Sequence, residues 1–189
     1  MLANEVGPAV AKSLVTHGVA AVAISGRTSG TLIAKALTSL VDGTAANLGL
    51  VGVVTDVNTS SIEELVSAGK VPVISPIAAD SQGSIGYNVN ADLAAAAIAG
   101  ALDAEWLIVM TDVEGIYRYW PDKDSLITSI SASELESLKA TFAQGMAPKV
   151  QACLDAIGAG AKAVRIIDGT NPSALKRALM GEGGTLVVA

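Results

Sequence analysis

Short apolar runs alternate with helical patterns along this sequence, and that rhythm restricts the fold more than any other feature. The apolar runs have the length of buried strands and cover residues 19–24, 71–77 and 106–110. Further strands are expected at residues 163–167 and 185–188, with extended pieces at 48–57 and 85–89. Helical patterns cover residues 4–17, 60–68, 90–102, 148–158 and a segment from 131 onward. Strands that alternate with helices predict a mostly parallel sheet covered on both faces. The expected fold is therefore α/β, with three αβα layers.

Polar residues mark several of the expected helix starts. Ser60 with Glu63, and Ser131 with Glu134, have the spacing of capping boxes. Asn171 is expected to cap a helix whose first residue is Pro172. A further possible helix covers residues 31–40, after a loop of small and polar residues at 25–30.

Composition sets the class of protein and excludes some partners. The 189 residues are 51% hydrophobic, 16% charged and only 3% aromatic, so the core must consist of small aliphatic side chains. The net charge of −6 and the absence of a Lys/Arg cluster argue against nucleic acid as a partner. Cys153 is the only cysteine, and no apolar stretch reaches the length of a membrane span. We expect one cytoplasmic domain over residues 1–189, without a metal-ligand set and without a membrane partner.

The predicted topology indicates where a ligand would bind. In open α/β sheets, ligands collect at the carboxyl ends of the strands. That rule selects five segments before any family is considered: residues 25–30, 88–92, 111–117, 145–149 and 168–169.

Lys149 is the most informative residue of these segments. Pro148 is expected to be the first helical residue, which places a lysine in the first turn of the helix. A cation there opposes the helix dipole, whereas a bound anion would be attracted both by the ammonium group and by the free N–H groups of the turn. Phosphate binding is one reading. A lysine whose stem swings into solvent, at a cost of about 0.3 to 1 kcal/mol, is equally compatible with the pattern.

Two further segments carry polar groups at a strand end. Asn88 and Asp92 flank Asn90, the expected N-cap of the helix at 90–102, and an acid in a first turn is also favourable without any function. Thr111 and Asp112 directly follow an apolar strand, where they could hold a ribose or form an Asx turn.

Taken in order, four motifs carry a resemblance that spans nearly the whole chain. They are Asn-Val-Asn-Ala-Asp at 88–92, Leu-Ile-Val-Met-Thr-Asp-Val-Glu-Gly at 107–115, Gly-Met-Ala-Pro-Lys-Val at 145–150 and Ile-Ile-Asp-Gly at 166–169. This order resembles the N-acetylglutamate kinases, a branch of the amino acid kinase family. The combination of the first and third motifs separates that branch from the carbamate, glutamate, aspartate and uridylate kinases of the same fold.

The resemblance implies an activity and a set of residue roles. The activity is phosphorylation of the γ-carboxylate of N-acetyl-L-glutamate by ATP with Mg²⁺, an early step of arginine biosynthesis. Lys149 would contact the ATP phosphates and stabilise the transferring group, and Asp92 would hold the catalytic lysines in place. Asn88 would bind acetylglutamate. The nucleoside would lie near Thr111, Asp112, Tyr117 and Met146.

The resemblance also implies an organisation into lobes and an amino-terminal truncation. Residues 1–90 would be the remnant of an acetylglutamate-binding and dimerisation lobe, and residues 91–189 the nucleotide-binding lobe. Similar kinases begin with a strand that carries a lysine and paired glycines, a second glycine-rich loop and a substrate-binding arginine, all upstream of Met1. We therefore expect this chain to be inactive alone. The alternative is a noncatalytic short form that binds nucleotide or pairs with a complete kinase subunit.

A homo-oligomer, dimer or higher, is expected because residues 4–17 resemble the dimer-forming helix of these kinases. A different acid substrate such as carbamate would require the region of Asn88 to bind a molecule of another shape.

Overall fold

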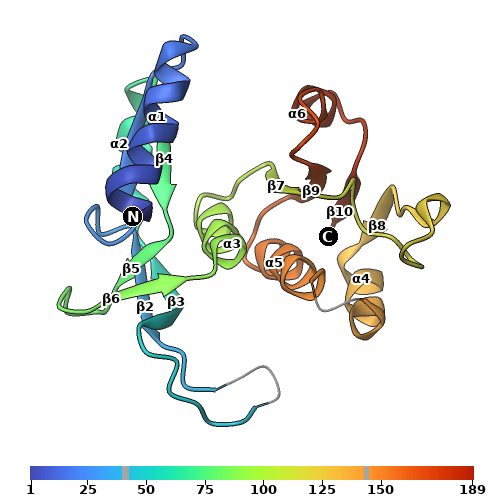
Figure 1. The fold of residues 1–189 in the computed structure, drawn as a ribbon, viewed down its shortest axis with the longest axis horizontal. Helices are drawn as coiled ribbons and strands as arrows, with labels where there is room; N and C mark the ends of the chain where they lie inside the picture. The colour runs from blue at the N-terminus through green and yellow to red at the C-terminus, as the bar shows by residue number, and fades with distance from the viewer. Residues whose placement is uncertain (40–42, 143–144) are drawn as a thin grey trace. The chain divides into compact units, whose positions relative to one another are not determined.

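The computed structural model describes residues 1–39, 43–142 and 145–189, and these form two compact units, Met1–Ala94 and Ala95–Ala189 (Figure 1). Helices and strands alternate in the second unit, as the sequence predicts, whereas in the first unit three strands follow each of the two α-helices that precede α3. The boundary between the units falls within helix α3 (Ala91–Ala101).

The first unit contains a parallel strand pair and a small closed barrel. Strands β1 and β4 pair in parallel, from Ala21 opposite Val71 to Ser25 opposite Ser75. The barrel has the order β2-β3-β6-β5 and mixes parallel and antiparallel pairs. The elements before α3 are η1 (Leu2–Val6), α1 (Gly7–Thr16), β1 (Ala21–Ser25), β2 (Leu32–Ala36), β3 (Val51–Val57), α2 (Ser60–Ser67), β4 (Val71–Ser75), β5 (Ile77–Ala79) and β6 (Gly86–Val89).

The prediction of a possible helix at residues 31–40 is wrong, because Leu32–Ala36 form the strand β2. Leu32 and Ala34 are buried, and the strand pairs antiparallel with β3. Pairing with a distant strand overrode a local pattern that fits either structure. The end of the predicted helix, at Leu40, lies outside the described residues.

The first turn of α2 differs in detail from the predicted capping box. The N-cap is Thr59 rather than Ser60, and the Thr59 hydroxyl donates to Glu63 Oε1 over 2.7 Å. The backbone N–H of Ser60 donates instead to the side chain of Asn58 (3.0 Å). The helix therefore starts where predicted, with different partners.

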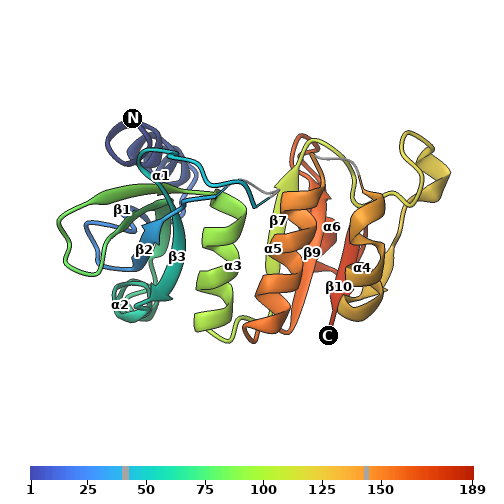
Figure 2. The ribbon, with the colours of Figure 1, turned by 90° about the horizontal axis from the view of Figure 1, so that it is seen from below.

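The second unit is a four-stranded sheet with helices on both faces. Its order is β7-β9-β10-β8, with β7/β9 and β10/β8 parallel and β9/β10 antiparallel. Figure 1 shows α5 and α6 on opposite sides of the sheet, and Figure 2 shows α4 beside α5. After α3 its elements are β7 (Leu107–Thr111), η2 (Lys123–Ser125), β8 (Ser129–Ser131), α4 (Ala132–Leu138), η3 (Lys139–Thr141), α5 (Ala147–Gly158), β9 (Ala163–Asp168), α6 (Ala174–Leu179) and β10 (Thr185–Val188). The α/β class is confirmed.

Small aliphatic side chains build the core of this unit. Val164 and Ile166 of β9 are fully buried, as are Val150 and Ala156 of the α5 face that covers them. The first five residues of β9 are all buried, and they are apolar except for Arg165, because the strand lies inside the sheet with both faces covered. A Cβ atom at Gly100 of α3 would overlap the Cβ of Ala159, so only glycine allows this close approach.

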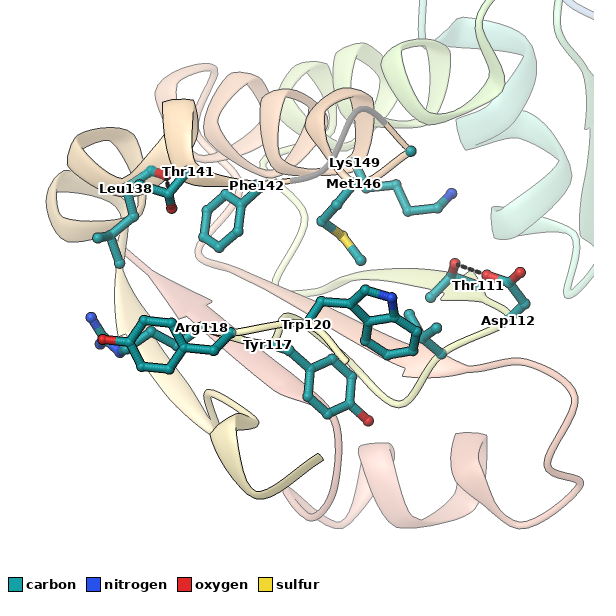
Figure 3. A pocket seen from close by; sticks show the side chains of 13 residues that line it. Thr111, Asp112, Tyr117, Arg118, Trp120, Leu138, Thr141, Phe142, Met146 and Lys149 are labelled. Atoms are coloured by element: carbon teal, nitrogen blue, oxygen red, sulfur yellow. Dashed lines mark hydrogen bonds between the residues drawn. The ribbon is translucent and has the colours of Figure 1, made fainter. Parts of the chain in front are cut away.

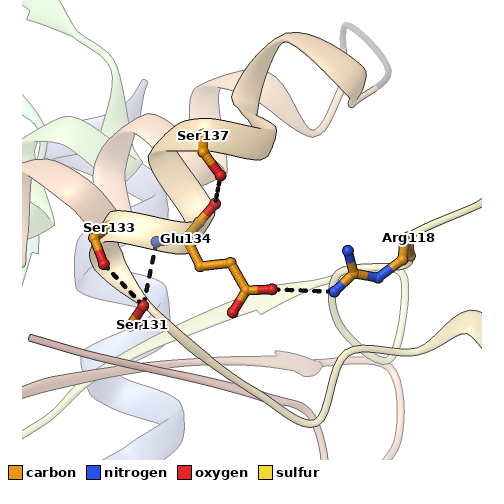
Figure 4. Close-up of polar contacts among 5 residues, drawn as sticks. All are labelled: Arg118, Ser131, Ser133, Glu134 and Ser137. Atoms are coloured by element: carbon orange, nitrogen blue, oxygen red, sulfur yellow. Dashed lines mark hydrogen bonds and ion pairs between the residues drawn. The ribbon is translucent and has the colours of Figure 1, made fainter.

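Helix starts in the second unit agree with the sequence in one case and shift in two. Ser131 caps α4 by accepting from the backbone N–H of Glu134 over 3.2 Å, as predicted (Figure 4). α5 begins at Ala147, one residue before Pro148. α6 begins only at Ala174, because Asn171 accepts from the N–H of Ser173 (3.0 Å) in a turn before the helix.

A buried cation lies on β9. The side chain of Arg165 is 4% exposed, and its guanidinium donates to the carbonyl oxygens of Gly181 and Gly183. Its central carbon lies 5.4 Å from the ring centroid of Trp106, which gives a cation–π contact. Burial lowers the pKa of this guanidinium from its ordinary value. The cation thus attaches β9 to the segment between α6 and β10.

Candidate functional site

A cavity of about 900 Å³ lies at the carboxyl end of β7, within the second unit. Its lining comes from three segments: the residues after β7, the end of α4 with η3, and the start of α5. The lining residues are Thr111, Asp112, Val113, Tyr117, Arg118, Tyr119, Trp120, Leu138, Thr141, Phe142, Gly145, Met146 and Lys149 (Figure 3).

The first polar groups of the cavity come directly from the strand. Thr111 is the last residue of β7, and its hydroxyl donates to Asp112 Oδ1 over 3.1 Å (Figure 3). The end of β7 is aligned with the end of β9, because Thr111 pairs with Asp168 and the N–H of Gly169 donates to the Thr111 carbonyl (2.8 Å). The sheet therefore fixes the position of this edge of the cavity.

The excursion after β7, residues 116–127, forms one wall of the cavity. Two backbone hydrogen bonds join its arms, one from Ile127 N to Ile116 O (2.8 Å) and one from Arg118 N to Ser125 O (2.9 Å). The fully buried hydroxyl of Thr185 holds its base by accepting from Ile116 N (2.8 Å) and donating to Ile127 O (2.6 Å). The excursion is therefore attached to β10 at its base.

Tyr117 is buried, whereas the next three residues of the excursion are exposed. Its side chain is 7% exposed, and its hydroxyl donates to Glu114 Oε2 over 3.1 Å. Burial raises the pKa of the Tyr117 phenol, and the Glu114 hydrogen bond, the Glu114 charge and the Asp168 charge raise it further. The phenol therefore keeps its proton and remains a hydrogen-bond donor.

The opposite wall of the cavity comes from η3 and the start of α5. Phe142 and Met146 point from this side toward the excursion (Figure 3). Arg118 of the excursion forms an ion pair with Glu134 of α4, with 3.2 Å between Nη2 and Oε1 (Figure 4). Both side chains are about half exposed, so the pair contributes at most about 1 kcal/mol.

Lys149 occupies the first turn of α5 at the edge of the cavity. The N-cap is Met146, whose thioether is a poor acceptor for the N–H groups of that turn. A half-buried lysine at a helix start with no strong side-chain cap is an arrangement that suits an anion. Five residues predicted for the nucleotide line this cavity together: Thr111, Asp112, Tyr117, Met146 and Lys149.

The other two predicted site residues belong to the first unit. Asn88 lies on β6, is exposed, and donates its backbone N–H to the carbonyl of Leu50 (2.8 Å). Asp92 is half-buried in the first turn of α3, and its backbone N–H donates to the Asn90 side chain over 2.9 Å. Asn90 is thus the N-cap that the sequence predicts.

Two other segments selected by the strand-end rule have internal roles in the fold. In the loop at residues 25–30, the Ser29 hydroxyl lies 2.7 Å from both the Ser25 carbonyl and the Thr31 hydroxyl. Asp168 accepts from the N–H (2.8 Å) and the hydroxyl (2.6 Å) of Thr170, and these hydrogen bonds lower the pKa of Asp168 from its ordinary value.

Sequence reasoning missed most of the aromatic lining. The chain has two tryptophans, three tyrosines and one phenylalanine, and four of these line the cavity: Tyr117, Tyr119, Trp120 and Phe142. Three aromatic side chains within four residues, in a chain so poor in them, is a signal that could have identified this wall. Arg118, Val113, Leu138 and Thr141 carry no comparable signal.

Within the described residues, no three His, Cys, Asp or Glu side chains form a group that could hold a metal ion. Asp112 is the carboxylate that lines the cavity. Mg²⁺ is usually held by one or two carboxylates together with water and substrate phosphates, so this donor set fits a magnesium ion that arrives with a phosphorylated ligand. None of the described helices is long and apolar enough to cross a membrane.

Fold and cavity together define the class: an α/β protein with a pocket beyond the carboxyl end of a parallel strand, bordered by a lysine at a helix start. The sequence profile described as "Amino acid kinase family" matches residues 2–168. The chain therefore belongs to the amino acid kinase family.

Individual proteins and solved structures show which members of the family this chain is similar to. The chain is 45% identical over 184 residues to a protein named acetylglutamate kinase from Corynebacterium urealyticum, and the match covers 97% of this chain and 60% of that protein. A solved structure from Streptococcus mutans UA159 matches with a TM-score of 0.78 and 27% identity, covering 100% of this chain and 69% of the other. A Giardia carbamate kinase structure matches with a TM-score of 0.73, and covers 100% of this chain and 70% of the other. At 16% identity that likeness concerns the fold alone.

The chain spans between 55% and 62% of the length of the curated relatives that it matches.

Proposed function

We propose that this chain serves the ATP-dependent phosphorylation of the γ-carboxylate of N-acetyl-L-glutamate, a step of arginine biosynthesis in the cytoplasm. The name of the 45%-identical relative supports the substrate. The observation that carries the proposal is the cavity of about 900 Å³ at the end of β7, with Lys149 at its edge. That volume suits a nucleotide-sized ligand.

The residue roles follow the chemistry of phosphoryl transfer, in which positioning and charge stabilisation dominate. Lys149 and the N–H groups of the first turn of α5 would bind the phosphates and stabilise the charge on the transferring group. Thr111, Asp112, Tyr117 and Met146 would surround the nucleoside.

The first unit would supply the acceptor side of the reaction. Asn88, exposed at the end of the barrel strand β6, would bind acetylglutamate through its amide. Asp92 would position the lysines that contact phosphate, and it would act without accepting the substrate proton. Residues 1–90 are thus proposed as the acetylglutamate and dimerisation part, and residues 91–189 as the nucleotide part, of one functional domain.

The second candidate function is nucleotide binding without phosphoryl transfer, alone or beside a complete kinase subunit. It is favoured by the location of the cavity, whose lining residues all belong to the second unit. Nucleotide could therefore bind whether or not acetylglutamate is phosphorylated.

A homo-oligomer is part of the proposal. The amino-terminal helical segment exposes Leu2, Val6 and Val10, which follow one another at intervals of four residues and lie on one face. Such a face supports pairing with a second copy. Sedimentation equilibrium tests this point, and a purely monomeric chain at micromolar concentration would contradict it.

Calorimetric titration with MgADP tests the nucleotide site. We expect the Lys149→Ala variant to weaken binding by roughly ten-fold or more, because a hydrogen bond to a charged group is lost. The matched control is Lys176→Ala, which removes a lysine that is exposed on α6. Equal affinity of both variants and wild type would refute the role of Lys149.

A coupled assay of ADP release separates the two candidate functions. A catalytically active chain would release ADP faster when N-acetyl-L-glutamate is added with ATP, and would not respond to L-glutamate or carbamate. The proposed inactivity of this chain alone predicts no stimulated release. MgADP binding without any stimulated release would favour the noncatalytic function for the chain alone.

A further inference from the structure

Most of the aromatic side chains of this chain line the cavity. Four of the chain's aromatic side chains line it, and two of them are strongly exposed, Tyr119 at 69% and Trp120 at 58%. An indole that stays exposed inside a concave site is available to a ligand. In a protein whose core is built from alanine, valine, leucine and isoleucine, this placement indicates a binding role.

The two walls of the cavity place aromatic rings and a thioether on opposite sides of the cavity. Trp120 comes from the excursion, while Phe142 and Met146 come from the opposite wall (Figure 3). In that view Phe142 and Met146 point toward the excursion, and the indole of Trp120 lies on the excursion side of the cavity. A planar ring inserted there would have the indole on one side and a phenyl ring and a thioether on the other, which are the groups that favour stacking.

The indole of Trp120 is also packed against another aromatic ring. Its ring contacts the ring of Tyr117 edge to face, with 5.3 Å between the centroids and an interplanar angle of 64°. Tyr117 in turn is held by the hydrogen bond from its hydroxyl to Glu114 Oε2 (3.1 Å). Glu114 is exposed and is not one of the lining residues of the cavity. A chain of contacts therefore runs from Glu114 through Tyr117 to Trp120.

We propose that Trp120 is the surface on which the nucleobase of the bound nucleotide stacks, and that Glu114 is a positioning residue that holds this surface through Tyr117. The inference rests on the proposed function in that it takes a nucleotide as the ligand. It adds a binding residue, Trp120, and a residue that acts through two others. Glu114 touches neither base nor phosphate in this assignment.

Stacking determines the class of nucleotide that this surface accepts. Every base has a π-face, so an aromatic surface discriminates weakly between bases, and purines gain more than pyrimidines because their rings are larger. Adenine and guanine nucleotides should bind within a few-fold of each other. A cytidine nucleotide should bind more weakly.

Intrinsic fluorescence tests the proposal, because the chain has only two tryptophans. In a Trp106→Phe background, Trp120 is the only remaining indole, and phenylalanine preserves an aromatic ring over Arg165. We expect MgADP and adenosine to quench this emission, and magnesium tripolyphosphate to leave it unchanged. Trp120→Ala should weaken MgADP binding about five- to hundred-fold, the range for loss of one stacked base.

Glu114 is tested by variants of its own. Glu114→Ala and Tyr117→Phe each remove the hydrogen bond, and each should weaken MgADP about two- to ten-fold and shift the Trp120 emission. The double variant should be no weaker than the worse single one, because both remove the same contact. Glu114→Gln keeps a carbonyl acceptor and should recover most of the affinity. Tripolyphosphate affinity should stay constant in all four.

The outcomes separate this inference from the function on which it rests. MgADP binding that depends on Lys149, together with unchanged Trp120 emission and a neutral Trp120→Ala variant, would refute the stacking surface and leave the phosphate site standing. Quenching by adenosine in the Lys149→Ala variant would support the stacking surface independently. A folded chain that binds neither adenosine nor MgADP would overturn both proposals. Equal losses for Glu114→Gln and Glu114→Ala would overturn the role of Glu114 alone.

Discussion

Replacing Thr185 by valine should destabilise the second unit, because its hydroxyl is the hydrogen-bond partner of two backbone groups at the base of the cavity wall. The side chain is fully buried and bonds Ile116 N at 2.8 Å and Ile127 O at 2.6 Å. Valine has nearly the same shape but leaves both groups without that partner. A buried donor or acceptor left unsatisfied costs about 1 to 3 kcal/mol, so for the two groups we expect a loss of about 2 to 6 kcal/mol in the free energy of unfolding.

Urea denaturation followed by tryptophan fluorescence measures this loss. Both tryptophans belong to the second unit, so the signal reports on the part of the chain that contains Thr185. The control is Thr185→Ser, which keeps the hydroxyl, removes one methyl group, and should cost about 0.8 kcal/mol. The reasoning fails if the valine variant stays within about 0.5 kcal/mol of wild type, or if serine costs as much as valine.

Three further perturbations follow from single contacts. Gly184→Ala should prevent stable folding of the second unit, since the residue has φ +68° and a Cβ there would overlap the Ile166 carbonyl oxygen. Soluble yield and circular dichroism measure the loss of folding, and a stable, folded variant would contradict the prediction. Ser131→Ala removes the N-cap of α4 and should cost about 1 kcal/mol in urea unfolding, whereas Ser131→Asp should cost little. Thr170→Val should raise the pKa of Asp168 toward its ordinary value, because the hydroxyl donor disappears. Any stability that comes from the lowered pKa is present above the ordinary carboxyl pKa and is lost as the pH falls through the pKa of the folded state. NMR titration of the carboxyl carbon measures this pKa, and an unchanged value in the variant would disprove the assignment.

The sequence was sufficient for most of the fold because burial and helix starts leave local patterns. The mainly apolar run of β9 and the cap at Ser131 can be read from a few neighbouring residues. Strand β2 could not be read in this way, because its pairing with β3 is a contact with a distant segment that local propensity does not record. The barrel of the first unit also depends on pairing between distant strands, which local propensity does not record.

The candidate site likewise contains residues that the sequence predicts and residues that only the tertiary fold brings together. Thr111, Asp112 and Lys149 follow from the strand-end rule and from the start of a helix, both of which are properties of sequence order. Trp120 and Phe142 lie more than twenty residues apart, and only the tertiary fold brings them to one cavity. Buried Tyr117 hydrogen-bonds to Glu114, a residue that has the appearance of an ordinary turn residue in the sequence.

The buried cation of β9 has a consequence for behaviour in salt. Arg165 is held by two carbonyl dipoles and an indole face rather than by a carboxylate, so dissolved ions have no exposed pair to screen there. The pair between Arg118 and Glu134 is half exposed, and raising the ionic strength from 0.1 M to 1 M shortens the Debye length from about 10 Å to about 3 Å. Concentrated salt should therefore loosen one wall of the cavity while the sheet behind it keeps its strength.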